Sequence, residues 1–596
     1  MNNLQIMKTK IYILLFLLVL NKAHVSFAES LPYDSVIGIW KTIEKKISNL
    51  KYKKQKMATV GSGDSCDYKT IQSGLDSGAS TIFVTNSGAP YYENLKINAR
   101  DIQILGGYEN CLAVIEGKAP KSNTVINGSK TGSVITILEN EKFSDEVVMS
   151  FKRLKFENGL AEFGGGISLG PKVIGIIELA DVVINNNVAT YDGGGIYVNS
   201  NSSLSFWLTH SLVSENQAQY SGGGIYCKGK NSFLFNKNNI VNANDASYGG
   251  GINADSCLIQ AFTPFEMSEN YAKKHGGAML AYFGQIELYG FQLCYLENFC
   301  FGEGFQPILI KNNTAGTTVQ QGYGGGFYFD GNSEVTLKNL LVYENQADVG
   351  GAFAVFGKAD VLIEGEKTLC RRREGCNHYF QNRAQIGGVF SLFDEAKLTT
   401  ANTVYYKNLA SQGVILAHQV GHWLYSNPTE LIMEGNLIYS NGIDGDMVNL
   451  YTNDELFLLR NNSVTNISFT TIAKNKVTKS VFNDNGKKFQ LMTSIINEDL
   501  AIYTGGGSEE IWLDCLLVSE NNSLPPGGTI NVGDAKFVNS DLFDFHLTSQ
   551  SQAIDFCDDM FISPNYLDMD GHLRGVDYIP KSNIYGVYDL GFDEFL

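Results

Sequence analysis

The chain has 596 residues and a formal net charge of -17. This charge argues against a nucleic-acid partner, because phosphate binding depends on clustered Lys and Arg. Arginine is scarce, and the run Arg371 to Arg373, which lies between Cys370 and Cys376, is interpreted as a small exposed loop. The length admits several globular domains, although a repeat array can reach it as a single unit.

The N-terminus has the three parts of a secretory signal peptide. Lys8 and Lys10 precede an apolar run from Ile11 to Leu20, and small residues end at Ala28. The apolar run is shorter than the roughly 20 residues that span a bilayer, so a transmembrane anchor is disfavoured. We expect residues 1–28 to be cleaved and the mature chain to be exported, without a transmembrane segment.

Residues 29–60 are expected to form an N-terminal cap. Ile37 to Leu50 is a candidate amphipathic helix, and Lys51, Lys53, Lys54 and Lys56 follow it. The segment either caps a repeat array or tethers it by charge, and capping is the simpler interpretation.

Ten cysteines in an exported chain favour disulfides. Cys294 with Cys300 and Cys370 with Cys376 are close enough to staple local loops, and Cys66 with Cys111 can clamp the first coil. A zinc site is disfavoured because no Cys-x-x-Cys spacing is present.

A repeated phrase begins near residue 150 and is clearest to residue 415. It consists of an apolar residue, two variable residues, Asn-x-Ala, a short polar gap and Gly-Gly before another apolar residue. The asparagines are Asn187, Asn216, Asn244, Asn270, Asn313, Asn345, Asn382 and Asn408, with differences of 29, 28, 26, 43, 32, 37 and 26 residues. The glycine runs keep the same phase and include Gly194, Gly223, Gly250 and Gly325.

The phrase predicts an all-β, right-handed, single-stranded parallel β-helix of the pectin-lyase-like kind over residues 61–500. Stretches after the glycines, such as Ile196-Tyr197-Val198, are β-branched or aromatic and alternate with period two, as strands do. Coils of this length suit short strands that pair about 4.8 Å apart with their equivalents in neighbouring coils. Each Gly-Gly marks a corner with positive φ or with no room for a Cβ. Asn tolerates left-handed geometry, and stacked amides can form a ladder.

These phrases resemble the repeats of the chlamydial polymorphic outer membrane proteins, which pair Phe-x-x-Asn with Gly-Gly-Ala-Ile. The resemblance covers roughly residues 150–415 and implies a β-helix at a bacterial surface. Residues 501–596 contain Asp568-Met569-Asp570-Gly571 and Asp589-Leu590-Gly591, and resemble the terminal segment of bacterial choice-of-anchor β-helix proteins. That second resemblance implies a cap over the last coil.

Polysaccharide lyases and hydrolases share this fold, so an enzyme is one alternative. A hydrolase needs grouped Asp residues with Gly-His-Gly and Arg-x-Lys nearby, and the sequence lacks this combination. Gly421-His422-Trp423 and Asp558-Asp559 are interpreted as turns.

A lyase needs calcium-binding carboxylates and a Lys or Arg base. Lys228 and Asp255 hold the same phase in adjacent coils, where a cross-coil ion pair is the favoured interpretation. Asp568 to Gly571 begins like a calcium loop without its remaining ligands, and Asp444 to Asp446 is similar. We therefore expect turns and no cofactor, with calcium as the alternative. His275 replaces a tyrosine of sibling coils and is expected to be a packed ring.

A surface signal comes from the strands that follow the glycines. If Ile196, Ile225, Ile252 and Phe327 point inward, alternation sends their neighbours outward. The candidate ligand-binding residues on this face are Tyr197, Tyr226, Tyr282, Tyr328, Lys228, Asp255 and Asp330. Either the face is exposed and binds a partner, or inserted loops cover it.

The sequence thus favours a secreted or cell-surface binding protein, adhesin-like and without catalytic residues. A glycan or a surface protein is the expected partner. A purely structural surface component and a polysaccharide lyase or hydrolase are the alternatives.

Overall fold

A computed structural model describes the following residues: 45–46, 56–86, 88–139, 146–198, 202–262, 264–290, 307–316, 319–365, 377–419, 427–442, 452, 454–498, 502–504, 510–519, 527–558, 567–578 and 583–595. Lys45 and Lys46 are helical. The signal peptide, the other residues of the predicted N-terminal helix and four sequence features lie outside these ranges. The four features are Cys294/Cys300, Cys370/Cys376, Gly421–Trp423 and Asp444–Asp446.

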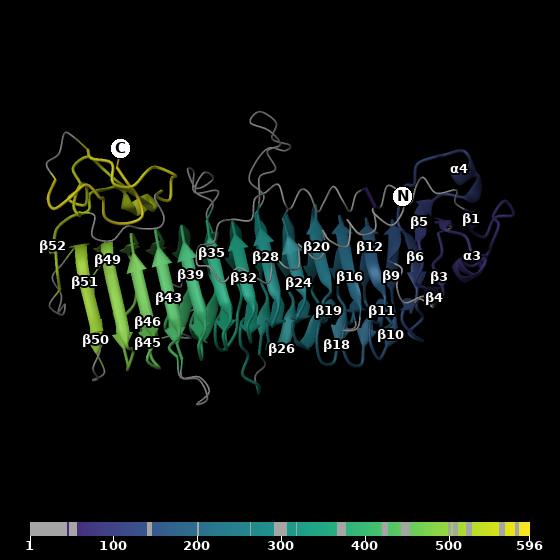
Figure 1. The fold of residues 1–596 in the computed structure, drawn as a ribbon, viewed down its shortest axis with the longest axis horizontal. Helices are drawn as coiled ribbons and strands as arrows, with labels where there is room; N and C mark the ends of the chain where they lie inside the picture. The colour runs from purple at the N-terminus through teal and green to yellow at the C-terminus, as the bar shows by residue number, and fades with distance from the viewer. Residues whose placement is uncertain are drawn as a thin grey trace, which may run out of the picture. The chain divides into compact units, whose positions relative to one another are not determined.

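The described strands between residues 57 and 532 form a right-handed parallel β-helix, as predicted (Figure 1). One 30-stranded sheet contains two parallel ladders, which merge where β49 pairs with both β46 and β47. The first ladder consists of β1 (Met57–Val60), β2 (Thr81–Thr85), β5 (Ile102–Tyr108), β8 (Val147–Lys152), β12 (Ile174–Ala180), β16 (Ser203–Thr209), β20 (Ser232–Asn236), β24 (Leu258–Ala261), β28 (Gln285–Tyr289), β32 (Glu334–Lys338), β35 (Asp360–Glu364), β39 (Lys397–Ala401), β43 (Glu430–Glu434), β46 (Val464–Ser468), β49 (Lys488–Asn497) and β51 (Glu510–Val518). The second consists of β3 (Tyr91–Tyr92), β6 (Thr124–Asn127), β9 (Leu154–Glu157), β13 (Val183–Asn185), β17 (Leu212–Ser214), β21 (Asn239–Asn242), β25 (Phe265–Ser268), β29 (Ile308–Lys311), β33 (Leu340–Tyr343), β36 (Asn377–Phe380), β40 (Thr403–Tyr406), β44 (Leu437–Tyr439), β47 (Thr471–Ala473) and β52 (Ile530–Val532).

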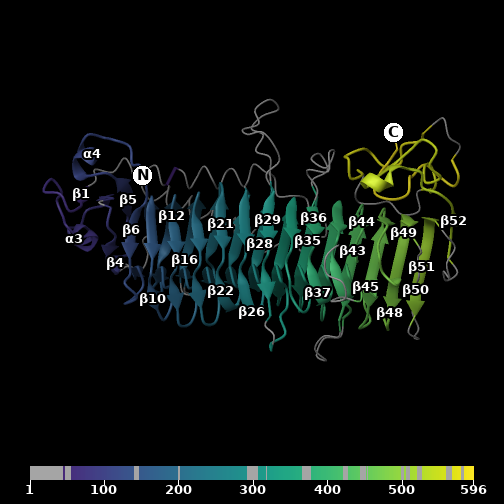
Figure 2. The same cartoon turned by 180° about the vertical axis from the view of Figure 1, so that it is seen from behind.

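A separate 14-stranded sheet forms the face that follows the glycines (Figure 2). Its strands are β4 (Leu95–Asn98), β7 (Ile135–Leu138), β11 (Ile167–Leu169), β15 (Ile196–Val198), β19 (Ile225–Lys228), β23 (Ile252–Asp255), β27 (Met279–Tyr282), β31 (Phe327–Asp330), β34 (Phe353–Val355), β38 (Phe390–Leu392), β42 (Leu416–His418), β45 (Glu455–Leu459), β48 (Lys479–Asn483) and β50 (Ile502–Thr504). Short strands occupy the corner before the glycines: β10 (Leu160–Ala161), β14 (Val188–Ala189), β18 (Gln217–Ala218), β22 (Asp245–Tyr248), β26 (Tyr271–His275), β30 (Thr314–Ala315), β37 (Arg383–Ile386) and β41 (Leu409–Gln412).

The core lies inside the coils, because side chains of one phase point inward from every face. Ile196 pairs with Ile225, which pairs with Ile252, and all three have no exposed surface. Phe327 is equally buried, so the predicted inward phase is confirmed. Like residues stack on like residues between coils: the rings of Phe206 and Phe233 lie 4.6 Å apart. This continuous stacking makes the solenoid one hydrophobic core.

The glycine corners combine two different backbone requirements. The first glycine of each run has positive φ, such as +68° at Gly193 and +64° at Gly222. At the second, close packing excludes a side chain: a Cβ on Gly223 would lie 2.5 Å from the carbonyl oxygen of Gly250. The other predicted corner glycines leave no room either: a Cβ would lie 2.4 Å from a backbone oxygen at Gly194, Gly250 and Gly325.

The repeated asparagines form the predicted ladder inside the corner. In each coil the backbone N–H and the Nδ2 of the Asn donate to Oδ1 of the Asn one coil later, at 3.0–3.2 Å. Each Nδ2 also donates to a carbonyl of the preceding coil, such as Asn187 to Phe156 at 3.0 Å. The ladder continues beyond the clearest repeats through Asn441 and Asn475, and the carboxylate of Glu498 accepts its last two N–H groups. Every predicted corner asparagine belongs to it: Asn187, Asn216, Asn244, Asn270, Asn313, Asn345, Asn382 and Asn408.

The expected left-handed conformation lies one residue before the ladder, which corrects that part of the prediction. Asn186 has φ of +55°, and Glu215, in the next coil, has the same value. This offset explains the first copy of the phrase, where Asn158 is left-handed and Gly159 takes the ladder position. The N–H of Gly159 donates to Oδ1 of Asn187 at 2.8 Å.

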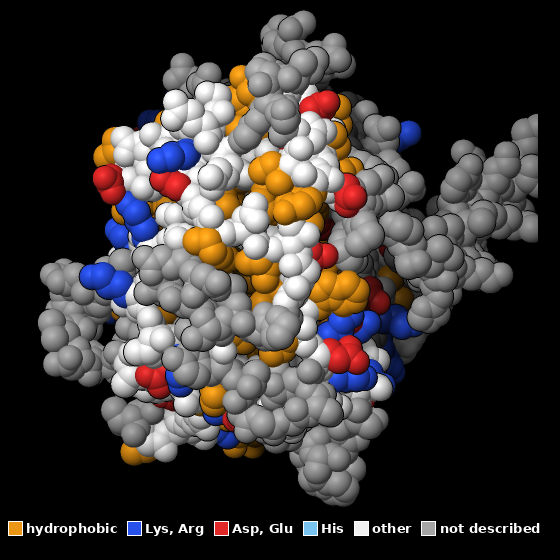
Figure 3. Space-filling view, turned by 90° about the vertical axis from the view of Figure 1, so that its left-hand side faces the viewer, with side chains coloured by type: hydrophobic (Ala, Val, Ile, Leu, Met, Phe, Trp, Pro, Cys, Tyr) orange, Lys and Arg blue, Asp and Glu red, His pale blue; other side chains and the backbone are white. Residues whose placement is uncertain are grey.

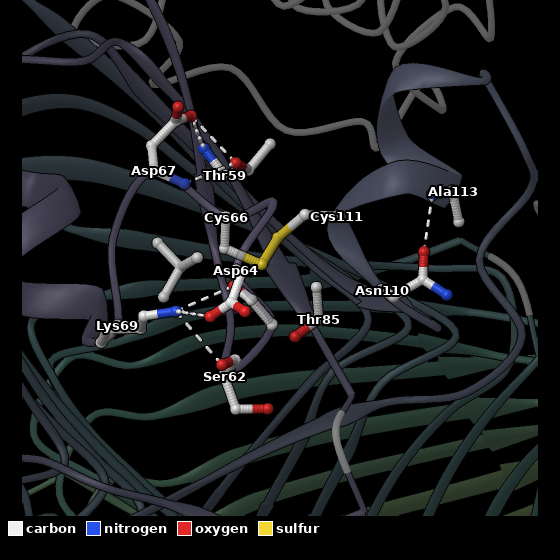
Figure 4. The surroundings of a disulfide bond; sticks show 12 residues. Thr59, Ser62, Asp64, Cys66, Asp67, Lys69, Thr85, Asn110, Cys111 and Ala113 are labelled. Atoms are coloured by element: carbon white, nitrogen blue, oxygen red, sulfur yellow. Dashed lines mark hydrogen bonds and ion pairs between the residues drawn. A yellow bond between two sulfur atoms is a disulfide. The ribbon is translucent and has the colours of Figure 1, made fainter.

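The N-terminal coil is closed by two short helices, α3 (Ile71–Asp76) and α4 (Cys111–Ile115). Figure 4 shows the disulfide between Cys66 and Cys111, a pairing that the sequence allowed without fixing the connectivity of the cysteines. Asn110 caps α4 by accepting from the N–H of Ala113 at 2.8 Å. Two further disulfides, Cys227–Cys257 and Cys515–Cys557, join segments 30 and 42 residues apart in sequence.

The described residues of 533–595, here called the clasp, lie against the side of the coils, which corrects the expected cap over the last coil (Figure 1). The clasp contains β53 (Phe537–Asn539), the 3-10 helix η2 (Ser540–Leu542) and β54 (Asp544–Leu547). Its Phe545, Met569 and Phe592 form a buried cluster with outward-facing Val404 and Leu437. Ile495 and Leu517 extend this apolar row to a second cluster with the clasp.

The clasp is also held by polar and covalent contacts. The guanidinium of Arg574 lies 4.4 Å from the centre of the Phe469 ring, and its nitrogens donate to the carbonyls of Gly591 and Phe592. A disulfide between Cys557 of the clasp and Cys515 of β51 joins the clasp to the coils. Seen from the end that carries β51, hydrophobic side chains gather near the middle and charged ones lie more toward the rim (Figure 3).

A buried histidine inside the solenoid gives a prediction for acid stability. The His418 ring has no exposed surface and contacts the hydroxyls of Thr429 and Thr465 at 2.6 and 2.9 Å. Burial lowers the pKa of His418 to about 3 in the folded chain. The same side chain in the unfolded chain binds a proton near pH 6.5, so the free energy of unfolding falls as the pH drops from about 6.5 toward 3. Between pH 7 and pH 4, His418 alone should lower the free energy of unfolding by about 3 kcal/mol.

The test compares urea unfolding of His418→Gln and the parent chain at pH 7 and pH 4. The variant should lose less stability in acid by about that amount. His210→Gln is the matched control, because the His210 side chain is 47% exposed. An equal acid loss in the parent and His418→Gln would contradict the assignment.

Candidate functional site

The predicted outward residues lie in two parallel rows on the 14-stranded sheet. Tyr197 and Tyr226 are register partners in the first row, which continues through Asn253 and Leu280 to Tyr328. The second row runs from Lys228 through Asp255 and Tyr282 to Asp330. The predicted site residues therefore share one face, but the tyrosines do not form a single ladder.

Rings on this face and on the adjoining corner before the glycines form a group that we call the ring cluster: Phe163, Tyr191, Tyr197, Tyr220 and Tyr226. Tyr197 stacks on Tyr226 with ring centres 5.5 Å apart and planes 5° apart. Phe163 bridges to the corner stack, at 4.8 Å from Tyr197 and 5.4 Å from Tyr191. Tyr191 stacks on Tyr220 at 5.4 Å, and the two residues are 45% and 46% exposed. Large apolar surfaces this exposed and this close together mark binding sites more often than isolated ones do.

Tyr191 and Tyr220 were missed by the sequence reasoning, although a signal was present. Each lies two residues after the Ala of an Asn-x-Ala phrase, and Phe163 lies two after Ala161. Because coils stack in register, equivalent positions in adjacent coils place their rings about one strand spacing apart.

Charged groups flank the ring cluster. The Lys228 amine contacts the Asp255 carboxylate at 2.8 Å, so the favoured cross-coil ion pair is confirmed. The hydrogen bond from Lys228 to Asp255 raises the pKa of the lysine. Asp192 accepts a hydrogen bond from the N–H of Ser221 at 3.0 Å, and burial raises the pKa of its carboxyl. Burial also raises the pKa of both Tyr197 and Tyr226, so their hydroxyls stay neutral hydrogen-bonding groups.

The first row is closed to solvent further along the sheet. Tyr328 is only 9% exposed, because its ring lies between His275 at 4.7 Å and Phe356 at 5.0 Å. Its hydroxyl donates to the Asp330 carboxylate at 3.3 Å. His275 is the packed ring that the sequence indicated, and desolvation lowers its pKa to about 4.

Tyr282 stands apart from the ring cluster. It is 43% exposed and packs edge-on against Phe283 with ring centres 4.3 Å apart. This position makes it a natural comparison for the cluster tyrosines.

Titratable side chains also come close together in the clasp. Within the described ranges, one set of three such residues, His546, Asp570 and Asp593, has ligand atoms within 4.8 Å of one another. Asp568, the first residue of the calcium-like sequence, uses both carboxylate oxygens as backbone acceptors, from the N–H groups of His572 and Glu594.

Comparison with known proteins agrees with the predicted resemblance to the chlamydial repeats. The family model of the Chlamydia polymorphic membrane protein repeat matches residues 181–199 and 210–228, which are two successive coils. The chain thus resembles that repeat family in sequence and has the parallel β-helix expected from the resemblance. The match is to a membrane-protein repeat, and an exported or cell-surface location agrees with it. No curated protein matches the chain. Among the described residues, no helix has the length and apolar character needed to cross a membrane.

Proposed function

We propose that this protein is a non-enzymatic cell-surface binding protein whose ring cluster binds an uncharged glycan. The observation that carries the proposal is the half-exposed stack of Tyr191 and Tyr220 beside the Tyr197 and Tyr226 pair. Rings stacked along the coil axis turn their edges outward, and a tyrosine edge carries a hydroxyl that bonds sugar hydroxyls. The apolar ring bodies supply contact area at low entropic cost.

Charge supports an uncharged ligand over an anionic one. Asp192 and Asp255 flank the cluster, the Lys228 amine is neutralised by its ion pair, and the chain carries a net charge of -17. A sulfated or uronate glycan would meet repulsion here. The same ion pair argues against a lyase site at this face. Lys228 has a raised pKa and stays protonated, so it cannot accept the proton that a lyase base must remove.

The test measures binding of neutral glycans, selected on a glycan array, to the Tyr191→Ala/Tyr220→Ala double variant. Loss of two rings should weaken binding at least 10-fold, since each aromatic contact contributes about 1 kcal/mol. Tyr282→Ala is the matched control, with equal exposure but no place in the ring cluster, and should bind as the parent does.

Two outcomes would contradict the proposal. One is unchanged glycan binding in the double variant. The other is binding to cell surfaces that survives enzymatic removal of glycans but disappears in the double variant, which would indicate a protein partner instead.

A further inference from the structure

Three segments of the clasp, far apart in sequence, bring metal-binding side chains to one point. His546 comes from β54, Asp570 from the turn after Leu567, and Asp593 from the C-terminal segment. Their ligand atoms all lie within 4.8 Å of one another. Ligands of a small divalent ion sit about 2.0–2.2 Å from it, so modest side-chain rotations bring these three atoms into one coordination sphere.

The imidazole of His546 is oriented as metal-binding imidazoles are. Nδ1 contacts the Asp544 carboxylate at 2.5 Å, and Nε2 faces Asp570 at 2.8 Å. A carboxylate that accepts from one ring nitrogen fixes the tautomer in which the other nitrogen has a lone pair for a metal. Asp544 would then be a positioning residue, outside the coordination sphere.

Asp593 supplies an independent observation. The residue is only 6% exposed, and its Oδ2 accepts from the N–H of Leu547 at 3.1 Å. No residue in the described part of the chain donates a hydrogen bond to its Oδ1. The Asp593 carboxylate is largely withdrawn from water, and a cation bound at the adjoining histidine and aspartate would offset its negative charge.

We propose that His546, Asp570 and Asp593 bind a first-row divalent metal ion, with zinc the best match. One imidazole nitrogen with carboxylate oxygens suits zinc or manganese, whereas calcium takes six to eight oxygen ligands. At Asp568 to Gly571 the sequence favoured a simple turn, with calcium as the alternative, and both carboxylate oxygens of Asp568 accept hydrogen bonds from backbone N–H groups. The ion would join β54, the turn at Asp570 and the C-terminal segment, which strengthens the clasp in the way that a structural metal does.

The experiment uses the full mature chain after EDTA treatment and dialysis. Titration calorimetry with ZnCl2, MnCl2 and CaCl2 should show one zinc ion bound with a Kd of about 10 µM or tighter, and zinc should raise the thermal unfolding midpoint. Asp593→Asn nearly preserves shape and should weaken zinc binding at least 100-fold. Asp544→Asn should weaken it about 10-fold, as loss of an orienting group does.

His572→Ala is the control, because His572 is the clasp's other imidazole near a carboxylate, 3.4 Å from Asp568, and lies outside the proposed site. Its zinc affinity should equal that of the parent. Absence of zinc binding, or binding unchanged by Asp593→Asn, would overturn the proposal and leave His546 as a protonated bridge between Asp544 and Asp570. One calcium ion bound in preference to zinc would overturn the choice of metal. Glycan binding at the ring cluster is a separate readout that no clasp variant should change.

Discussion

Replacing Asn187 by alanine should lower the free energy of unfolding by about 2–6 kcal/mol. Its side chain satisfies the N–H of Gly159 and the carbonyl of Phe156, at 2.8 and 3.0 Å, in a site with no exposed surface. Alanine leaves both buried backbone groups without a partner, and each costs about 1–3 kcal/mol. Urea unfolding at pH 7 measures the change.

The neighbouring residue is a control of the same type. Asn186 is exposed and left-handed, with φ of +55°, and belongs to no ladder bond. Asn186→Gly should keep or slightly raise stability, since glycine adopts this φ without strain. If both variants were equally stable, the ladder would contribute nothing and the corner would owe its stability to backbone geometry alone.

Replacing Gly223 by alanine should destabilise the chain by about 3 kcal/mol or more. The new Cβ would lie 2.5 Å from the carbonyl oxygen of Gly250 and 2.6 Å from that of Asp245. Both oxygens belong to the next coil, so relief of the clash requires that two coils separate and lose parallel-sheet hydrogen bonds there. Thermal unfolding, followed by far-UV circular dichroism, measures the loss.

Gly78→Ala separates packing from conformation. Gly78 has φ of +76° and nothing within 4 Å of a built Cβ. Its substitution should cost only about 1–2 kcal/mol, the strain of a left-handed alanine. A loss at Gly223 no larger than at Gly78 would show that the coils tolerate a methyl group between them.

Most of the fold prediction came from the constant spacing between the repeated Asn, Gly and inward-facing residues. Asn187 and Gly194 recur with fixed phase to inward residues such as Ile196, and this pattern specifies both the corner and the strand after it. The pattern did not reveal which residue is left-handed. In most coils that position holds Glu, Lys or Gln, side chains without a known preference for positive φ.

The clasp and the ring cluster were predicted less well because both depend on outward positions. Val404, Leu437, Ile495 and Leu517 are apolar on the outer side, which indicates lateral cover, but resemblance to a terminal cap suggested another position. Tyr328 points outward by alternation and is still buried, since rings of the adjoining corner pack over it. Alternation gives the side of a sheet on which a residue lies and not what lies above it.

The ladder bonds have the same length whatever the length of chain between them. Asn270 reaches Asn313 across 43 residues at 3.0 Å, and Asn382 reaches Asn408 across 26 residues at 3.1 Å. Extra residues between two corners therefore do not change the lengths of the hydrogen bonds that join successive turns of the spiral. Loop length and loop sequence are free to diverge while the scaffold stays constant, so this architecture suits the grafting of foreign peptides between rungs.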